Sequence, residues 1–164
     1  GEGAYDQSGN ELRRDVLVYT SSPLARGIEV TGTLEVVLYV ESSAPDTDFT
    51  AKLVDVYPDG RAFNVQDGAL RMRYREGFSK SLLMKPGEIY EIHLDLHATS
   101  NYFDKGHRVR LEISSSNFPR WDRNLNTGGR NFDERAWAAA NNVVHHGPRY
   151  PSRIVLAVVP HGQP

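Results

Sequence analysis

The chain has 164 residues, of which 39% are hydrophobic and 24% charged, and it has no cysteine. This composition is typical of a globular domain and excludes collagen, coiled coils, long disorder, disulfide frameworks, thiolate zinc sites and cysteine nucleophiles. The net charge of −2, with no apolar run near the roughly 20 residues of a membrane span, predicts neither a nucleic-acid nor a membrane partner.

The ends of the chain suggest how it is organised. Residues 1–14 are polar and contain glycine, so we expect a linker or N-terminal arm ahead of one domain over 15–164. The first residue is Gly and no signal peptide is visible, which predicts a processed form or an excised domain. The sequence leaves the compartment open, with the cytoplasm slightly favoured over secretion, and it leaves a homo-oligomer open as well.

Alternating apolar and polar residues predict strands along most of the chain, because successive side chains of a strand point to opposite faces. In chain order the expected strands are 15–20, 34–40, 49–57, 61–65, 70–75, 90–96, 108–113 and 153–159. The stretches 49–57 and 153–159 are more continuously apolar, which suits central strands.

Turn residues separate these strands. Pro58-Asp59-Gly60 predicts a hairpin between 49–57 and 61–65, because Pro presets φ and Gly accepts a positive φ. Further turns are expected at 64–68, 85–87 and 104–106. Only the Ala-rich stretch 134–140 suggests a helix, of a turn or two.

Roughly seven to nine strands with almost no helix predict an all-β, antiparallel β-sandwich, with the jelly roll among its variants. A βαβ fold would need crossover helices, for which the chain has no sequence. One long loop, 114–142, interrupts the strands. Its residues Phe118, Trp121, Phe132 and Trp137 argue against disorder, so we expect an ordered loop that packs on another surface, such as a second domain.

The chain lacks a motif for nucleophilic catalysis. The nearest match to the G-x-S-x-G elbow is Gly77-Phe78-Ser79-Lys80-Ser81, which lacks the last Gly and lies between strands. We interpret it as a polar loop.

Histidines are the candidate metal ligands. His93, Asp95 and His97 share one strand face and could converge on zinc or another divalent ion. Because a spacing of two is automatic on a strand face, we favour the solvent side of an amphipathic strand, and we expect no cofactor. His145 and His146 are adjacent and would face opposite ways, so we expect one of them to be a packed or interface residue.

A basic stripe is formed by Arg71, Arg73 and Arg75 on one predicted strand. Arginines could hold a carboxylate or a phosphate through paired hydrogen bonds. We favour a solvated face that acids on a neighbouring strand balance.

Four segments carry a resemblance to a known family. They are 49–61, which ends in Asp55-Val56-Tyr57-Pro58-Asp59-Gly60-Arg61, 67–76, which begins Asp67-Gly68-Ala69-Leu70-Arg71, 105–120, which ends in Ser115-Ser116-Asn117-Phe118-Pro119-Arg120, and Tyr150-Pro151-Ser152-Arg153-Ile154. In this order and spacing they resemble the C-terminal domain of the Xaa-Pro dipeptidyl-peptidase and cocaine-esterase-like (CocE/NonD) serine hydrolases, over nearly the whole chain.

The resemblance implies a jelly-roll β-sandwich, like a galactose-binding domain, that follows an α/β-hydrolase catalytic domain in the same parent protein. Enzymes of this family hydrolyse esters, amides or Xaa-Pro peptide bonds with a Ser-Asp-His triad. None of the triad motifs matches this chain, so no catalytic residue is carried over to it, and we expect that it is not an enzyme by itself. The resemblance implies a non-catalytic module that packs on the catalytic domain and helps to wall its active site.

We expect the long loop to face that catalytic domain. The expected interface residues are Ser115, Asn117, Phe118, Arg120, Trp121, Asp122, Arg123, Asn124, His145 and His146. The chain departs from the family pattern at His146-Gly147, where a His-Asp-like pair is expected, and at Ala157, where proline is common.

Two other functions compete with this one. Trp121, Trp137 and Tyr102 could form a stacking platform of an autonomous carbohydrate- or ligand-binding module. The strand with His93 and His97 could serve a small metallohydrolase. A module of a larger hydrolase instead predicts an exposed apolar patch on the isolated domain.

Overall fold

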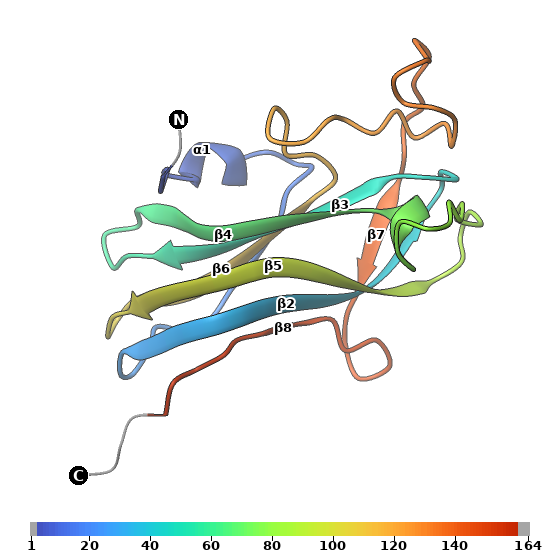
Figure 1. Ribbon diagram of the computed structural model, residues 1–164. Helices are drawn as coiled ribbons and strands as arrows, with labels where there is room; N and C mark the ends of the chain where they lie inside the picture. Colours follow the sequence, from blue (N-terminus) through green and yellow to red (C-terminus); the bar gives the residue numbers. More distant parts are fainter. Residues whose placement is uncertain (1–2, 161–164) are drawn as a thin grey trace.

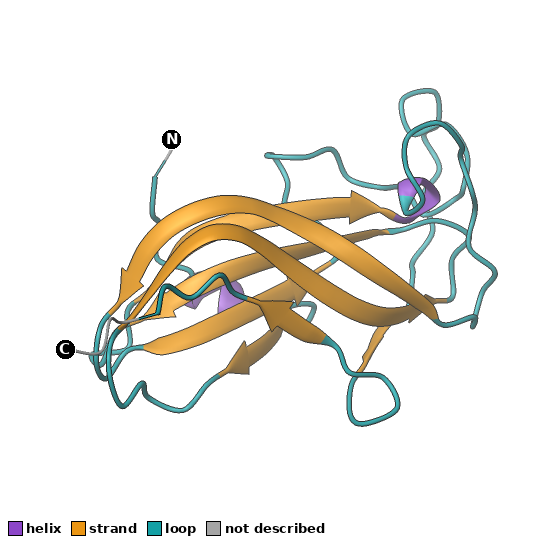
Figure 2. Ribbon diagram, turned by 60° about the horizontal axis from the view of Figure 1, so that its bottom comes forward, coloured by secondary structure: helices purple, strands orange, loops and turns teal. Residues whose placement is uncertain are grey.

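In the computed structural model, the chain folds into two antiparallel β-sheets (Figure 1). The structure describes residues 3–160. The first sheet has the order β1 (Leu17–Thr20), β6 (Arg108–Ser114), β3 (Asp48–Val56) and β4 (Ala62–Arg71). The second has the order β5 (Tyr90–Phe103), β2 (Ile28–Ser42) and β7 (Asn142–His145), and β8 (Arg153–Val155) also pairs with β2. The two layers confirm the predicted all-β sandwich (Figure 2). The jelly-roll connectivity stays a prediction.

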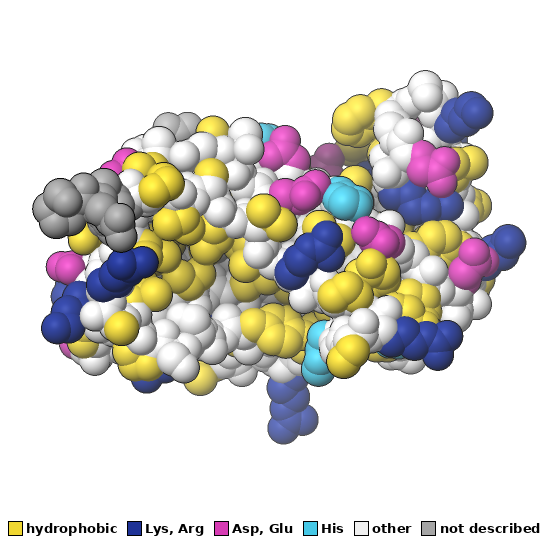
Figure 3. Space-filling model, turned by 90° about the horizontal axis from the view of Figure 1, so that it is seen from below, with side chains coloured by type: hydrophobic (Ala, Val, Ile, Leu, Met, Phe, Trp, Pro, Cys, Tyr) yellow, Lys and Arg dark blue, Asp and Glu magenta, His cyan; other side chains and the backbone are white. Residues whose placement is uncertain are grey.

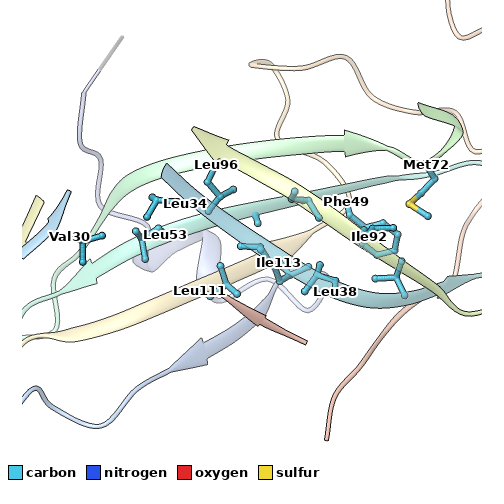
Figure 4. Packing of buried hydrophobic residues seen from close by; sticks show 14 of the residues in the cluster. Val30, Leu34, Leu38, Phe49, Leu53, Met72, Ile92, Leu96, Leu111 and Ile113 are labelled. Atoms are coloured by element: carbon cyan, nitrogen blue, oxygen red, sulfur yellow. The ribbon is translucent and has the colours of Figure 1, made fainter. Parts of the chain in front are cut away.

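Side chains that alternate along β2 and β5 fill the space between the sheets. They meet apolar side chains from β3 and β6 in one continuous cluster, which includes Val30, Leu34, Leu38, Phe49, Leu53, Ile92, Leu96, Leu111 and Ile113 (Figure 4). Burial of each such side chain stabilises the fold by about 1.5–3 kcal/mol. The apolar residues that alternate along the sequence thus form the inner face of the sandwich.

The predicted hairpin at Pro58–Gly60 is confirmed. β3 and β4 pair in antiparallel fashion around it, and Gly60 has the positive φ of 94° that this turn needs. β3 lies between β6 and β4 and is buried on both faces, as expected for a central strand.

The predictions of a turn at 64–68 and of a separate strand at 70–75 are wrong. β4 continues through both stretches to Arg71, with a register shift against β3 between Leu53 and Val54, and a 3-10 turn (η1, Met72–Tyr74) follows. Gly68 is needed because β4 passes close to β5 there. A Cβ atom at Gly68 would lie 2.3 Å from the backbone oxygen of Asp95. This glycine therefore marks a close approach of two strands and not a turn.

Two further elements differ from the prediction. The stretch 153–159 is not a central strand, since only β8 and an isolated bridge between Val158 and Val30 form, and Val155 and Val158 are each 46% exposed. An apolar run alone does not distinguish a central strand from an edge strand with exposed apolar side chains. The stretch 134–140 is not helical, and the Ala138 N–H donates to the Leu125 carbonyl across the long loop.

The N-terminal segment packs on the outer face of the first sheet. It contains α1 (Ser8–Glu11), and the buried Gln7 donates its backbone N–H to the Ala62 carbonyl at 2.7 Å. The boundary at residue 14 stays a prediction, but residues 5–11 behave as part of the domain. Within residues 3–160, no helix is long and apolar enough to cross a membrane.

Candidate functional site

The long loop leaves β6 at Ser114 and rejoins the second sheet at Asn142 (Figure 1). Residues 115–141 form no helix or strand, and the Phe118–Pro119 peptide bond is cis. The loop has no backbone ladder like that of a sheet, and side-chain contacts to the sheet add to its few internal backbone hydrogen bonds.

Asn124 ties the loop to two buried carboxylates. Its Nδ2 donates to Asp46 Oδ2 at 2.8 Å and to Asp48 Oδ1 at 2.7 Å. Asp46 is fully buried and Asp48 is 7% exposed. An amide that satisfies two buried carboxylates holds the loop firmly against the start of β3.

Two arginines complete this anchor. Arg71 binds Asp48 through two hydrogen bonds of 2.9 Å and also donates to the Asp122 carbonyl at 3.2 Å. The Asp48 carboxylate raises the pKa of Arg71. Arg73 binds Asp46 through Nε at 2.8 Å and donates to the Gly129 carbonyl at 2.8 Å. The arginines thus join the sheet to the loop.

The interpretation of the basic stripe is therefore confirmed only in part. Asp48 lies directly opposite Arg71 on the neighbouring strand, as expected for cross-strand balance. Arg73 lies on the 3-10 turn, and Arg75 follows that turn with its guanidinium 4.6 Å from the centre of the Tyr90 ring. The three arginines do not share a strand face.

Asp67 on β4 is a second anchor. It is 8% exposed, and its Oδ2 accepts a 3.0 Å hydrogen bond from Asn117 Nδ2. Its Oδ1 lies 3.2 Å from the Arg120 guanidinium. The family-like stretch 115–120 is thus fixed to the sheet independently of Asn124.

The outer side of the loop presents aromatic and arginine side chains. Phe118 is 55% exposed, Phe132 82% and Trp137 74%. The Arg123 guanidinium lies 4.3 Å from the Phe118 ring centre, and that of Arg120 lies 5.0 Å from the Trp121 ring. Aromatic residues and arginine are enriched where proteins contact one another. The loop thus exposes several large aromatic side chains, and the apolar patch expected of a module stays a prediction.

A polar pocket of about 460 Å³ lies between this loop, α1 and the outer face of β6. Ser114, Ser115 and Ser116 line it, together with Lys52, Arg13 and Glu112. Its lining includes no histidine, so the pocket has no serine–histidine pair of the kind that activates a nucleophile.

Glu112 is the unusual group in this pocket. It is 4% exposed, and burial together with the nearby Glu11 raises its pKa to about 7, against the attraction of Lys52. The Oε1 atoms of Glu112 and Glu11 are both buried without a hydrogen-bond partner. Glu112 therefore keeps its proton to a higher pH than an ordinary glutamate does.

The two histidines lie apart from the loop residues, at the far end of β7. His145 packs on the Tyr150 ring at 5.2 Å, with its Nε2 3.5 Å from Glu41. The His146 ring meets Tyr19 of β1 edge-on at 6.2 Å. The predicted interface residues therefore fall into two groups, Ser115–Asn124 and the histidine pair, and their role as an interface stays a prediction.

His93, Asp95 and His97 lie on the exposed face of β5. His93 Nδ1 is 2.8 Å from Glu35 Oε1, and His97 has a φ of 63°, so its side chain departs from the strand pattern. Within residues 3–160, no group of three or more His, Asp or Glu side chains is arranged to hold a metal ion. The two histidines lie beside local acids instead, His93 beside Glu35 and His97 beside Asp95.

The proposed stacking platform is not assembled. Tyr102 is 54% exposed near the end of β5, whereas Trp121 and Trp137 lie on the loop. In the described part of the chain, no ring contact joins any two of these three residues.

Sequence reasoning missed the acids that organise the site, namely Asp46, Asp48, Asp67 and Glu112. The arginine stripe was a signal that acids must lie nearby. For Asp48 only the strand register shows the pairing, because Asp48 and Arg71 are 23 residues apart in the sequence.

The comparisons with known proteins agree on one family. Residues 1–155 match the family described as the X-Pro dipeptidyl-peptidase C-terminal non-catalytic domain. The chain is 52% identical over 159 residues to cocaine esterase of Rhodococcus sp. (strain MB1 Bresler), covering 96% of this chain and 28% of that protein. A putative serine esterase of Mycobacterium bovis is 33% identical over 118 residues, covering 62% of this chain and 19% of its own length.

Solved structures extend the comparison. An α-amino acid ester hydrolase is 31% identical with a TM-score of 0.91, over 95% of this chain and 27% of that one. An aminopeptidase from a marine sediment Thaumarchaeota archaeon is 29% identical with a TM-score of 0.90, over 94% of this chain and 27% of that one. The chain therefore spans little more than a quarter of the length of these relatives.

Proposed function

The chain belongs to the family of X-Pro dipeptidyl-peptidase C-terminal non-catalytic domains, and from that premise we propose that it packs on an α/β-hydrolase catalytic domain of the same parent protein. In this role it helps to shape the active-site region of a serine hydrolase. The relatives named as an esterase, an ester hydrolase and an aminopeptidase support ester, amide or peptide bonds as the substrate class. The catalytic residues belong to the other domain.

The construction of the long loop carries the proposal. Its inner side is fixed by buried Asp46, Asp48 and Asp67, while its outer side leaves Phe118 and Trp137 more than half exposed. A loop that is held rigid yet exposes large aromatic side chains fits a surface that another domain covers. His145 and His146 would form a second contact on the side of β7.

Kinetics of the full-length polypeptide test the proposal. We expect the double substitution of Phe118→Ala and Arg123→Ala to lower kcat/KM for p-nitrophenyl acetate about tenfold, the loss that corresponds to about 1.4 kcal/mol. The matched control is Phe78→Ala, since Phe78 is 90% exposed in a different loop, and it should leave kcat/KM unchanged.

The chain of 164 residues on its own provides the complementary measurement. It should not turn over the ester. Saturable turnover that a serine substitution abolishes would overturn the proposal, and so would full activity of a parent polypeptide from which this domain has been deleted.

An autonomous carbohydrate- or ligand-binding module is the alternative function. Trp121 and Trp137 would report on it, because a sugar that stacks on either ring changes its fluorescence. Saturable quenching of the isolated chain by a glycan would favour this alternative, and flat titrations across a glycan panel would exclude it.

A further inference from the structure

The two long sides of the sandwich are built differently. On one side β4 and β5 close the gap, since Gln66 Nε2 donates to the Ala98 carbonyl at 2.9 Å and Gly68 lies against the Asp95 backbone. On the other side β1 ends the first sheet, and β7 and β8 end the second. These strands leave a groove between them.

The groove is apolar. Leu38, Val109, Leu111, Val144 and Ile154 line it, and its volume is about 440 Å³. Tyr19 and His146 meet at its mouth, and burial raises the pKa of the Tyr19 hydroxyl. The face that carries β8 shows hydrophobic side chains gathered around a hollow (Figure 3). The core of the sandwich thus continues to the surface here.

The strand beside this groove is an unprotected edge. In the described part of the chain, β1 pairs only with β6, so its other backbone edge has no strand partner. Leu17, Val18 and Tyr19 are 41%, 37% and 38% exposed, and β1 contains neither a charged residue nor a proline. Natural edge strands are normally blunted by charge, proline or a cover. β8 carries Arg153 at the opposite wall, which leaves β1 as the more open edge.

We propose that one extended segment of the parent polypeptide, outside the residues of this chain, adds a strand to the free edge of β1 and places alternate apolar side chains in the groove. This inference rests on the proposed function, because it requires the remainder of a larger hydrolase. The relatives have more than two thirds of their length outside the matched region, since the chain covers 28% and 27% of them.

A segment of the same polypeptide fits better than a second copy. Joined to the domain, it is present at a high effective concentration. Two β1 strands of four residues would by themselves bury much less than the roughly 1,200 Å² of a stable protein–protein interface. The free N–H and C=O groups of β1 and the apolar lining together select an extended, alternating apolar segment.

Hydrogen exchange of β1 in the isolated chain and in the full-length polypeptide tests this inference. We expect the amides of Leu17–Thr20 to exchange at least tenfold more slowly in the full-length polypeptide, whereas those of β3, already paired on both sides, keep their protection. Tyr19→Asp should abolish the added protection of β1, and Leu12→Asp, at an 86% exposed position outside the groove, should keep it.

Other results of the hydrogen-exchange experiment would refute either the added strand or the proposed function. Equal exchange of β1 in both polypeptides, with slower exchange of loop residues 115–124 in the full-length one, would refute the added strand and leave the proposed function standing. Equal exchange at both places would refute both. Slower exchange of β1 in the isolated chain at high concentration, with the mass of a dimer, would identify a second copy as the occupant and refute this proposal.

Discussion

Asp48 and Arg71 face each other across β3 and β4, and two hydrogen bonds of 2.9 Å join the carboxylate to the guanidinium. Asn124 binds the same carboxylate from the loop at 2.7 Å. One ion pair within the first sheet therefore also determines where a loop residue lies, although Asn124 is 76 residues from Asp48 along the chain.

Replacing Asn124 with leucine should loosen this loop and destabilise the fold. The substitution keeps the size of the side chain but removes the donor that Asp46 and Asp48 share. A lost hydrogen bond to a buried charged group costs about 1.5–3 kcal/mol. Urea unfolding should show a decrease of this size in the free energy of unfolding, and hydrogen exchange in 115–131 should quicken.

Asn141→Leu is the matched control, because Asn141 is exposed and its backbone makes the contacts to Ser43. Its free energy of unfolding should change by less than about 0.5 kcal/mol. Equal losses for the two variants would show that Asn124 does not anchor the loop.

Glu112→Gln should stabilise the protein at high pH. The pKa of Glu112 is raised to about 7 in the folded state from an ordinary value of 4.5. Between these pH values the folded state holds a proton that the unfolded state has released, so the contribution of Glu112 to stability decreases as pH rises. Glutamine resembles the protonated acid at every pH.

The variant should therefore match the wild type at pH 4 and exceed it by up to about 3 kcal/mol at pH 8, since a shift of one pKa unit corresponds to 1.36 kcal/mol. Urea unfolding at both pH values measures this difference. Glu88→Gln, at a 49% exposed side chain near Lys85, is the control and should show no such change with pH. A difference between wild type and Glu112→Gln that is the same at pH 4 and pH 8 would contradict the assignment.

Gly68→Ala should destabilise the closed side of the sandwich. The added Cβ would lie 2.3 Å from the Asp95 oxygen and 2.8 Å from a Leu96 methyl group, so β4 and β5 must separate. Overpacking of this kind costs about 1–3 kcal/mol and should lower the Tm. Gly9→Ala adds a methyl group with nothing within 4 Å and should leave the Tm unchanged or higher. A Tm for Gly68→Ala at the wild-type value would show that the strands can part freely.

The sequence predicted the sandwich well because its signal is local. Alternating residues such as Leu34, Val36 and Leu38 decide which face of a strand is buried, whatever their distant partners are. The errors arose where a distant contact sets the local structure. Gly68 suggested a turn, but a glycine is needed there because β4 passes close to β5. The stretch 153–159 suggested a central strand, although it forms only the short strand β8 at the edge of its sheet.

Only part of the site could be predicted from the sequence. The loop and its aromatic residues could be singled out, because length and composition are read directly from the chain. The acids beneath it could not be singled out. Strand pairing brings Arg71 to Asp48, and the fold of the 3-10 turn and of the loop brings Arg73 to Asp46 and Asn117 to Asp67.

The anchored loop also bears on the energetics of association. A flexible loop loses conformational entropy when a partner orders it, at about 0.5–1.5 kcal/mol for each immobilised side chain. Here Asp46, Asp48 and Asp67 have already fixed the backbone around Asn117 and Asn124. A domain that docks on this loop meets a preorganised surface, so more of its contact energy is available as affinity.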